Sequence, residues 1–257
     1  MYGICNLSLV PCRKEPSDRS EMVTQLLFGE QFTVLEKTEK WSHIRIEADG
    51  YQCWLDNKQY LSIPVNTFNA LSSSPRIHTT ELVQVMGTSD GGAFPVLIGS
   101  SLPAFSNGVC KIGDHSWKYE GQFTGSEMRT ERSGLIETAM LYLDAPYLWG
   151  GRSPFGIDCS GFTQMVYLLN GKRILRDASM QASEGVLLSF IEEAETGDLA
   201  FFDNPEGQII HVGIIMNNSR IIHASGRVRI DKFDHHGIFN AESGKYSHNL
   251  RMIRKII

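Results

Sequence analysis

The fold of this chain is decided by the stretch Pro146-Tyr-Leu-Trp-Gly-Gly-Arg-Ser-Pro-Phe-Gly-Ile-Asp-Cys-Ser-Gly-Phe-Thr-Gln-Met-Val-Tyr167. Its first half is rich in glycine, proline and aromatic residues, and it leads into Asp158 and Cys159. A helical pattern then begins, with apolar residues at i, i+3, i+4 and i+7: Phe162, Met165, Val166 and Leu169. Asn170-Gly171 follows as a stop signal. We therefore predict that Cys159 lies at or just inside the N-terminus of a buried helix.

This position suggests a chemical role for Cys159. Unpaired backbone N–H groups and the helix dipole stabilise negative charge at a helix start, so we expect the thiol to have a lowered pKa and to act as a nucleophile. The alternative is that Cys159 is a small buried hydrophobic residue, which would be preferred for a cysteine without context. Turn residues on one side and a helix start on the other favour chemistry.

Composition narrows the class of protein. With 257 residues, the chain has room for two or three domains, and 42% hydrophobic and 21% charged residues are typical of a globular protein. A net charge of −5, with no basic stripe interleaved with aromatic residues, argues against nucleic-acid binding. The longest uncharged stretches contain glycine, serine and proline, so we expect no membrane insertion.

The cysteines and the first residues bear on the compartment. The N-terminal residues lack the basic and long apolar regions of a secretion signal. Five cysteines at irregular positions favour a reducing compartment, and disulfides among the first four are the alternative. We therefore expect a cytoplasmic protein, or an exported one if the sequence begins after a removed signal. No cysteine or histidine spacing is typical of a zinc site, and we expect neither metal nor cofactor.

Three regions follow one another along the chain. Residues 1–63 alternate short strands and turns, and residues 76–126 repeat this all-β character. Between them, Pro64 and the cluster at residues 72–75 mark a linker region. Residues 128–257 begin with helical patterns, at 133–143 and after Cys159, and continue as a run of strands. Helices followed by antiparallel strands predict an α+β fold.

Two of the eight histidines are candidates for a base. His211 opens an apolar strand and His223 ends the next one. If these strands pair through the turn at 217–219, both rings lie at the same end of a hairpin, where one can act as base and the other can orient it. Taken singly, each fits a structural role at a strand end. The remaining histidines are assigned that structural role: His43, His78, His115, His235, His236 and His248.

At this point the chain resembles a known family. Five motifs in residues 130–257 look like those of NlpC/P60 cysteine peptidases, which are papain-like enzymes that cleave peptidoglycan peptides: Tyr147-Leu-Trp-Gly-Gly, Asp158-Cys-Ser-Gly-Phe, Gly197-Asp-Leu-Ala-Phe-Phe, His211-Val-Gly-Ile and Ile222-His-Ala-Ser. The resemblance implies Cys159 as nucleophile, His211 as general base and His223 as the residue that orients it. It implies that the Tyr147 hydroxyl helps to hold the oxyanion, whereas Trp149 only packs.

The earlier regions carry a second resemblance. The order of features around residues 20–30, Trp41 and residues 49–54 is similar to bacterial SH3-like domains, and residues 76–126 read as a second, diverged copy. The expected architecture is therefore a papain-like catalytic domain at 128–257, preceded by two small all-β SH3-like barrels at 1–63 and 76–126.

Paired SH3-like domains and the sequence Arg176-Asp177-Ala178 are similar to the YkfC-like branch, of dipeptidyl-peptidase VI type. Its members cut the γ-D-glutamyl–diamino acid bond of free muropeptides that begin with an unblocked L-alanine. The resemblance implies five substrate-binding residues, for most of which a structural role (a helix cap, a solvated charge or barrel packing) is the alternative: Asp158, Ser160, Asp177, Glu21 and Tyr51. Acidic and hydroxyl groups suit a buried ammonium.

The sequence thus predicts a hydrolase that acts through a Cys159 thioester on small peptidoglycan-derived peptides, without nucleic acid or an obligate protein partner. Candidates for the substrate carboxylates are Arg152, Arg176 and Lys172. One alternative is a hydrolase of intact cell wall that uses the SH3-like domains as wall-binding modules. Two others are an inactive binding module and acyl transfer to an amine.

Overall fold

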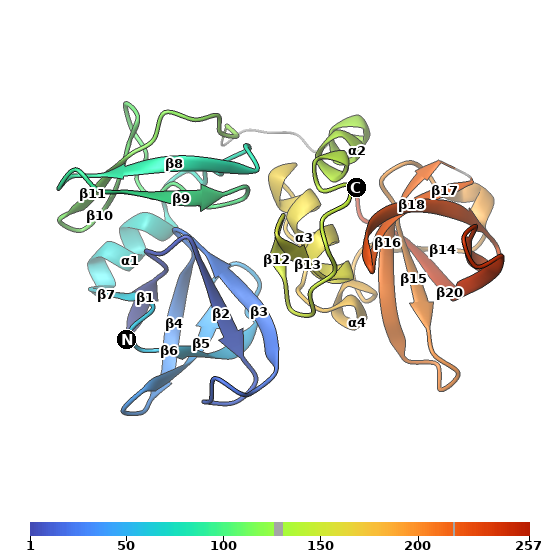
Figure 1. The fold of residues 1–257 in the computed structure, drawn as a ribbon, viewed down its shortest axis with the longest axis horizontal. Coiled ribbons are helices and arrows are strands. Elements are labelled where there is room, and N and C mark those ends of the chain that lie inside the picture. The colour runs from blue at the N-terminus through green and yellow to red at the C-terminus, as the bar shows by residue number, and fades with distance from the viewer. Residues whose placement is uncertain (126–130, 218) are drawn as a thin grey trace. The chain divides into compact units, whose positions relative to one another are not determined.

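The computed structural model describes residues 1–125, 131–217 and 219–257. The chain divides into two compact units, Met1–Met128 and Arg129–Ile257, each described here by itself. The first unit consists mainly of β-strands, and the second combines helices with a β-sheet (Figure 1). This is the α+β fold expected from the order of patterns in the sequence. In the described residues, no helix is long and apolar enough to cross a membrane.

The first unit begins with an antiparallel sheet in the order β3-β2-β6-β5-β4-β1-β7. In β5, Ile44 and Ile46 are buried while Arg45 is exposed, so the alternation in the sequence sets which face is the core. Gly50, at φ 74°, provides the turn into β6. The strands are β1 (Tyr2–Ile4), β2 (Leu9–Arg13), β3 (Met22–Leu27), β4 (Gln31–Lys37), β5 (Trp41–Ile46), β6 (Gln52–Asp56) and β7 (Leu61–Ile63).

The region expected as a linker contains a helix, α1 (Val65–Ser72). Its one buried residue, Phe68, packs in a cluster with Ile4 and Phe28 of the first sheet region. Pro64 occupies the N-cap position, where proline's missing N–H costs nothing. Eight residues are too few to show helical periodicity, which is why the sequence pattern did not indicate this helix.

A second antiparallel sheet follows in the order β10-β11-β8-β9. Its buried residues Met86, Val96 and Trp117 share one cluster with Ile4 and Phe28, so the two sheets of this unit have a common core. The strands are β8 (Val83–Thr88), β9 (Ala93–Leu97), β10 (Val109–Ile112) and β11 (His115–Lys118).

The second unit contains the helices α2 (Arg132–Leu141), α3 (Cys159–Leu169) and α4 (Ala178–Gln181), a small hairpin of β12 (Arg152–Ser153) and β13 (Gly156–Ile157), the 3-10 turn η1 (Ile191–Glu193) and a large sheet. The sheet has the order β14-β20-β15-β16-β17-β18-β19, and β20 also pairs with β19, which closes six strands into a barrel. Its strands are β14 (Val186–Leu188), β15 (Leu199–Asp203), β16 (Ile209–Asn217), β17 (Arg220–Ser225), β18 (Arg227–Asp234), β19 (Gly237–Asn240) and β20 (Lys245–Lys255).

Helix α3 is buried along almost its whole length and packs against β16 and α2 (Figure 1). The four apolar residues predicted for its buried face are all buried, and each such side chain contributes about 1.5–3 kcal/mol by leaving water. Polar residues on the other faces have partners inside the protein: the Thr163 hydroxyl donates to Gln181 Oε1 at 2.8 Å, and the Tyr167 hydroxyl donates to the Gly197 carbonyl. The middle and the end of α3 are therefore tied to neighbouring segments of the second unit.

Candidate active site

Cys159 is the first residue of α3, as predicted, and its side chain is buried. Asp158 has an extended backbone (φ −91°, ψ 175°) and caps the helix by accepting the Gly161 N–H at 2.6 Å. A Cβ at Gly161 would lie 2.3 Å from the carbonyl oxygen of Gly151, so only glycine allows the preceding turn to approach the helix this closely. These local contacts explain the Asp158-Cys-Ser-Gly sequence.

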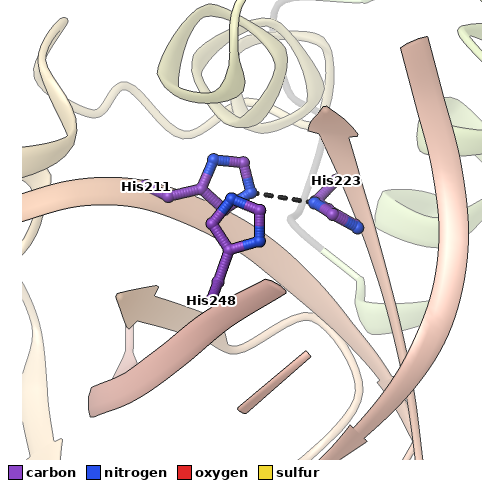
Figure 2. Close-up of side chains that lie close together, drawn as sticks. All are labelled: His211, His223 and His248. Carbon is purple, nitrogen blue, oxygen red and sulfur yellow. Dashed lines mark hydrogen bonds between the residues drawn. The ribbon is translucent and has the colours of Figure 1, made fainter. Parts of the chain in front are cut away.

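His211 and His223 lie on the neighbouring antiparallel strands β16 and β17. Gly213 is the residue directly opposite His223, so His211 lies diagonally across from it, on the same face. His211 Nε2 and His223 Nδ1 are 2.8 Å apart, with the rings nearly perpendicular at 85° (Figure 2). The structure thus brings the two rings together as the hairpin argument predicted; residue 218 of the expected turn lies outside the described residues.

The His211–His223 pair is joined by a third side chain, the carboxylate of Asp231, which the sequence did not indicate. His223 Nε2 lies 3.0 Å from Asp231 Oδ2 on β18, and Arg229 forms an ion pair with the same carboxylate. Burial opposes ionisation of Asp231, but its hydrogen bonds with His223 and Arg229 hold its pKa below the usual value. Asp231 is therefore an anion that accepts hydrogen bonds.

The Asp231 anion determines which nitrogen carries the proton in each of the His223 and His211 rings. Because ionised Asp231 only accepts, His223 must donate from Nε2 and accept at Nδ1. His211 then donates from Nε2, and its lone pair is on Nδ1. We call the chain Asp231, His223 and His211 the histidine relay. It leaves His211 Nδ1 able to accept a proton.

The thiol lies next to this relay in the fold. The backbone N–H of Val212, which directly follows His211, interacts with the Cys159 sulfur, as does the N–H of Ser160. The packing of α3 against β16 produces this approach. Cys159 and the strand that carries His211, far apart in sequence, are thereby brought together at the helix start.

The pKa of the Cys159 thiol differs from the value expected from the sequence. Burial raises the pKa of Cys159 to about 12, and the Asp158 charge adds to this; the Val212 and Ser160 N–H groups and Arg176 lower it by less. The expected lowering of the thiol pKa by the helix N-terminus is therefore wrong for the resting site. Burial, with His223 and His248 nearby, lowers the pKa of His211 well below its usual value. The resting pair is a neutral thiol beside a neutral imidazole.

Tyr147 is half-buried ahead of α3, in a β-bridge with Ile157. Burial and the nearby Cys159 and Asp158 raise the pKa of its hydroxyl, so the phenol stays protonated and able to donate. This agrees with the oxyanion role that the resemblance implies. Trp149 is 58% exposed, so a large part of its side chain is not packed against the protein.

Comparison with known proteins agrees with this geometry. The profile of the NlpC/P60 family matches residues 144–243, and that of the bacterial dipeptidyl-peptidase Sh3 domain matches residues 12–59. A γ-D-glutamyl-L-lysine dipeptidyl-peptidase of Bacillus subtilis is 30% identical over 223 residues, which cover 78% of this chain and 71% of the relative. The chain belongs to the NlpC/P60 family. It is an NlpC/P60 cysteine peptidase with an N-terminal bacterial SH3-like domain.

Other NlpC/P60 relatives extend the similarity. A γ-D-glutamyl-L-lysine dipeptidyl-peptidase of Bacillus cereus is 28% identical, covering 81% of this chain and 68% of the relative. Dipeptidyl-peptidase 6 of Lysinibacillus sphaericus is 26% identical, covering 82% of this chain and 83% of the relative. The crystal structure of an NlpC/P60 family protein from Bacillus cereus has a TM-score of 0.83 at 21% identity, covering 100% of this chain and 99% of that one. This structure shares the fold.

The carboxylate of Asp158 in this NlpC/P60 domain is fully engaged. It accepts from the N–H groups of Gly150 and Gly161, from the Ser160 hydroxyl and twice from Arg176, at 3.0 and 2.7 Å. A carboxylate offers about four lone-pair positions, so five donors leave no room for a substrate ammonium. The contacts fit the capping alternative for Asp158 and use the Ser160 hydroxyl as well, and the substrate-binding roles of both residues stay predictions.

The three basic candidates for substrate carboxylates differ in position. Arg176 and Arg152 are buried, and Arg176 is held by Asp158 and Ser160. Lys172 is exposed. The buried Arg176–Asp158 ion pair thus forms part of the structure around the start of α3.

Asp177 is the remaining acidic candidate in the NlpC/P60 domain. It is half-buried and occupies the N-cap position of α4, but its side chain does not cap that helix. Its charge acts on Arg176, which places it beside the cluster at the start of α3. A substrate-binding role for Asp177 stays a prediction that fits this position.

Glu21 and Tyr51 belong to the first unit. Glu21 is exposed and pairs with Lys14 at 3.4 Å, whereas Tyr51 packs against the core of the first sheet. Both contacts fit the structural alternatives given for these residues. Their substrate-binding roles stay predictions.

Two residues of the site were missed by sequence reasoning. Asp231 is reached only through the pairing of β17 with β18. His248, assigned a structural role, stacks on His211 with ring centroids 4.1 Å apart. It reaches His211 because β20 pairs with β15, the neighbour of β16. No spacing in the sequence signals either contact.

Proposed function

We propose that this protein hydrolyses the γ-D-glutamyl–diamino acid bond of small peptidoglycan-derived peptides that carry a free N-terminal L-alanine. The observation that carries the proposal is the histidine relay, which leaves His211 Nδ1 as an acceptor, on the strand whose next residue, Val212, directs its N–H to the Cys159 sulfur. The relatives named dipeptidyl-peptidases match this chain across both its SH3-like and its peptidase regions, which supports the choice of substrate.

The chemistry begins with proton transfer from the Cys159 thiol to His211 Nδ1 as the sulfur attacks the γ-carbonyl carbon of D-glutamate. The Tyr147 hydroxyl is a donor for the oxyanion that forms. His211 then gives its proton to the leaving amine of the diamino acid, and the C–N bond breaks to leave a thioester on Cys159. Water, losing a proton to His211, attacks this thioester, and the thiol is regenerated with release of the dipeptide.

The relay's charge distribution suits this cycle. A neutral thiol with a pKa of about 12 does not ionise by itself at neutral pH, so the proton must leave as the sulfur attacks. The imidazolium formed on His211 is stabilised through His223 by the Asp231 anion. His211 accepts the proton because it is neutral at rest.

Recognition of the free amine is assigned to Asp177. A substrate ammonium that leaves bulk water needs an anionic partner, and a half-buried carboxylate supplies one at lower desolvation cost than a fully buried one. The oxygens of Asp158 already accept hydrogen bonds from Gly161 and Arg176. Asp177→Asn is therefore expected to raise KM for peptides with a free amine more than it lowers kcat.

The test is product analysis by mass spectrometry. We expect L-Ala-γ-D-Glu to be released from L-Ala-γ-D-Glu-L-Lys or from its diaminopimelate counterpart, and no release by Cys159→Ala. An N-acetylated peptide should resist cleavage.

Cleavage of the acetylated peptide, or release from intact sacculi without cleavage of the free peptide, would instead support the cell-wall alternative. A ligated product in the presence of an added amine would indicate acyl transfer.

A further inference from the structure

Three histidines of the second unit converge at one point of the barrel. His211, His223 and His248 each offer one ring nitrogen, and these nitrogens all lie within 4.8 Å of one another. Figure 2 shows the three rings gathered, with His248 against the face of His211 and the His223 ring edge-on to both. They come from the different strands β16, β17 and β20. This group is called the His cluster.

The spacing suits a transition-metal ion. Zinc binds imidazole nitrogen at about 2.0–2.1 Å, which places two nitrogens of a tetrahedral site about 3.3 Å apart. In the ion-free cluster, His211 Nε2 and His223 Nδ1 are 2.8 Å apart and the widest separation is at most 4.8 Å. These separations bracket the tetrahedral value, and the stacked His211 and His248 rings must turn relative to one another for both to face one ion.

We infer that the His cluster binds a divalent transition-metal ion of the zinc type through its three imidazoles, and that this ion inhibits the peptidase. Imidazole is the nitrogen ligand that such ions prefer, and three ligands leave a fourth position open to water.

The surroundings of the His cluster resemble the outer partners of known imidazole–metal sites. His223 donates from Nε2 to Asp231, which directs its Nδ1 lone pair toward the cluster. His248 Nδ1 hydrogen bonds with the Ser247 hydroxyl at 2.9 Å, so its Nε2 is the nitrogen left for a ligand. Two of the three rings thus already have the outer hydrogen bond that orients a ligand.

Metal binding and catalysis exclude one another at His211. In the relay, Nε2 of His211 carries the proton and Nδ1 carries the lone pair. An ion at Nε2 needs the lone pair of that nitrogen, so the neutral ring must carry its proton on Nδ1 instead. When Nδ1 is protonated, His211 cannot take the Cys159 proton, and the His211–His223 hydrogen bond is lost. Removal of the ion restores the relay.

The decisive measurement is zinc binding by calorimetry to Cys159→Ala protein, in which the thiol cannot serve as a ligand. We expect one zinc ion per chain. His248→Phe in the same background keeps a ring stacked on His211 but removes its nitrogens, and should weaken binding at least about tenfold. His43→Phe is the matched control, because His43 stacks on Trp54 in the first unit, and it should leave the affinity unchanged.

The structure of zinc-soaked Cys159→Ala protein gives a second readout that does not depend on a folded His248 variant. Anomalous density between the three rings is the expected result. If no ion lies there, or if zinc binding needs Cys159 and is indifferent to His248→Phe, the inference is overturned. These measurements use no substrate, so they stand apart from the proposed function.

Discussion

The buried ion pair at the start of α3 allows a quantitative test of how this site is held together. Asp158→Asn keeps an oxygen that accepts the Gly161 N–H but removes the anion that Arg176 contacts at 2.7 and 3.0 Å. Arg176 is 1% exposed, so water cannot replace the lost carboxylate. The substitution therefore leaves a buried cation without its main partner.

The expected cost follows from these contacts. Breaking a buried pair by removing one partner costs about 3–5 kcal/mol. We expect the lower end, about 3 kcal/mol, because Asp177 also acts on the Arg176 charge. For a unit of residues 129–257, each kcal/mol corresponds to a shift in Tm of about 3–5 °C, which gives a decrease of about 10–15 °C.

The assay is calorimetric unfolding of the full chain, with Asp177→Asn as matched control and an expected cost below about 1 kcal/mol. In Asp158→Asn/Arg176→Met the stranded charge is gone, so the double variant should be more stable than Asp158→Asn alone. Equal effects of Asp158→Asn and Asp177→Asn, or strict additivity in the double variant, would refute the reasoning.

Three further predictions concern the relay and the thiol. Asp231→Asn should lower kcat about 10- to 100-fold with little change in KM. The reason is that an amide N–H facing His223 reverses the direction of the hydrogen bonds in the relay. An unchanged kcat in steady-state assays contradicts this prediction. Gly213→Ala should also lower kcat, since its Cβ would lie 2.9 Å from that of His223, whereas Gly87→Ala, with 3.9 Å to its nearest neighbour, serves as control. Burial raises the pKa of Cys159 to about 12, so the fraction of thiolate should rise about tenfold per pH unit between pH 7 and 10. The rate of alkylation of Cys159 by iodoacetamide should rise in the same proportion. A plateau of this rate below pH 8 argues for a resting ion pair.

The sequence predicted those parts of the site that depend on local signals. Turn residues, a capping aspartate and helical spacing located Cys159 at the start of α3, and two adjacent strands located His211 and His223. The family motifs added Tyr147. Each of these rests on residues close in the chain or on a hairpin between neighbouring strands.

What the sequence did not predict depends on distant pairing or on burial. His248 reaches the cluster only through the closure of the barrel by β20, which no local pattern encodes. The raised pKa of Cys159 comes from desolvation by surrounding elements, which outweighs the helix start that the sequence does show. The sequence pattern did not indicate the helix α1 because Phe68 is its one buried residue, so the helix has no repeating apolar face.

Closure of the barrel by the strand at residues 245–255 also bears on the order in which the site is completed during synthesis. β20 flanks β15, which in turn flanks β16, the strand that carries His211. A growing polypeptide that still lacks β20 has an open sheet edge beside β15, and the base is not yet supported. The support of His211 is therefore expected to be complete only once residues 245–255 have paired with β15 and β19.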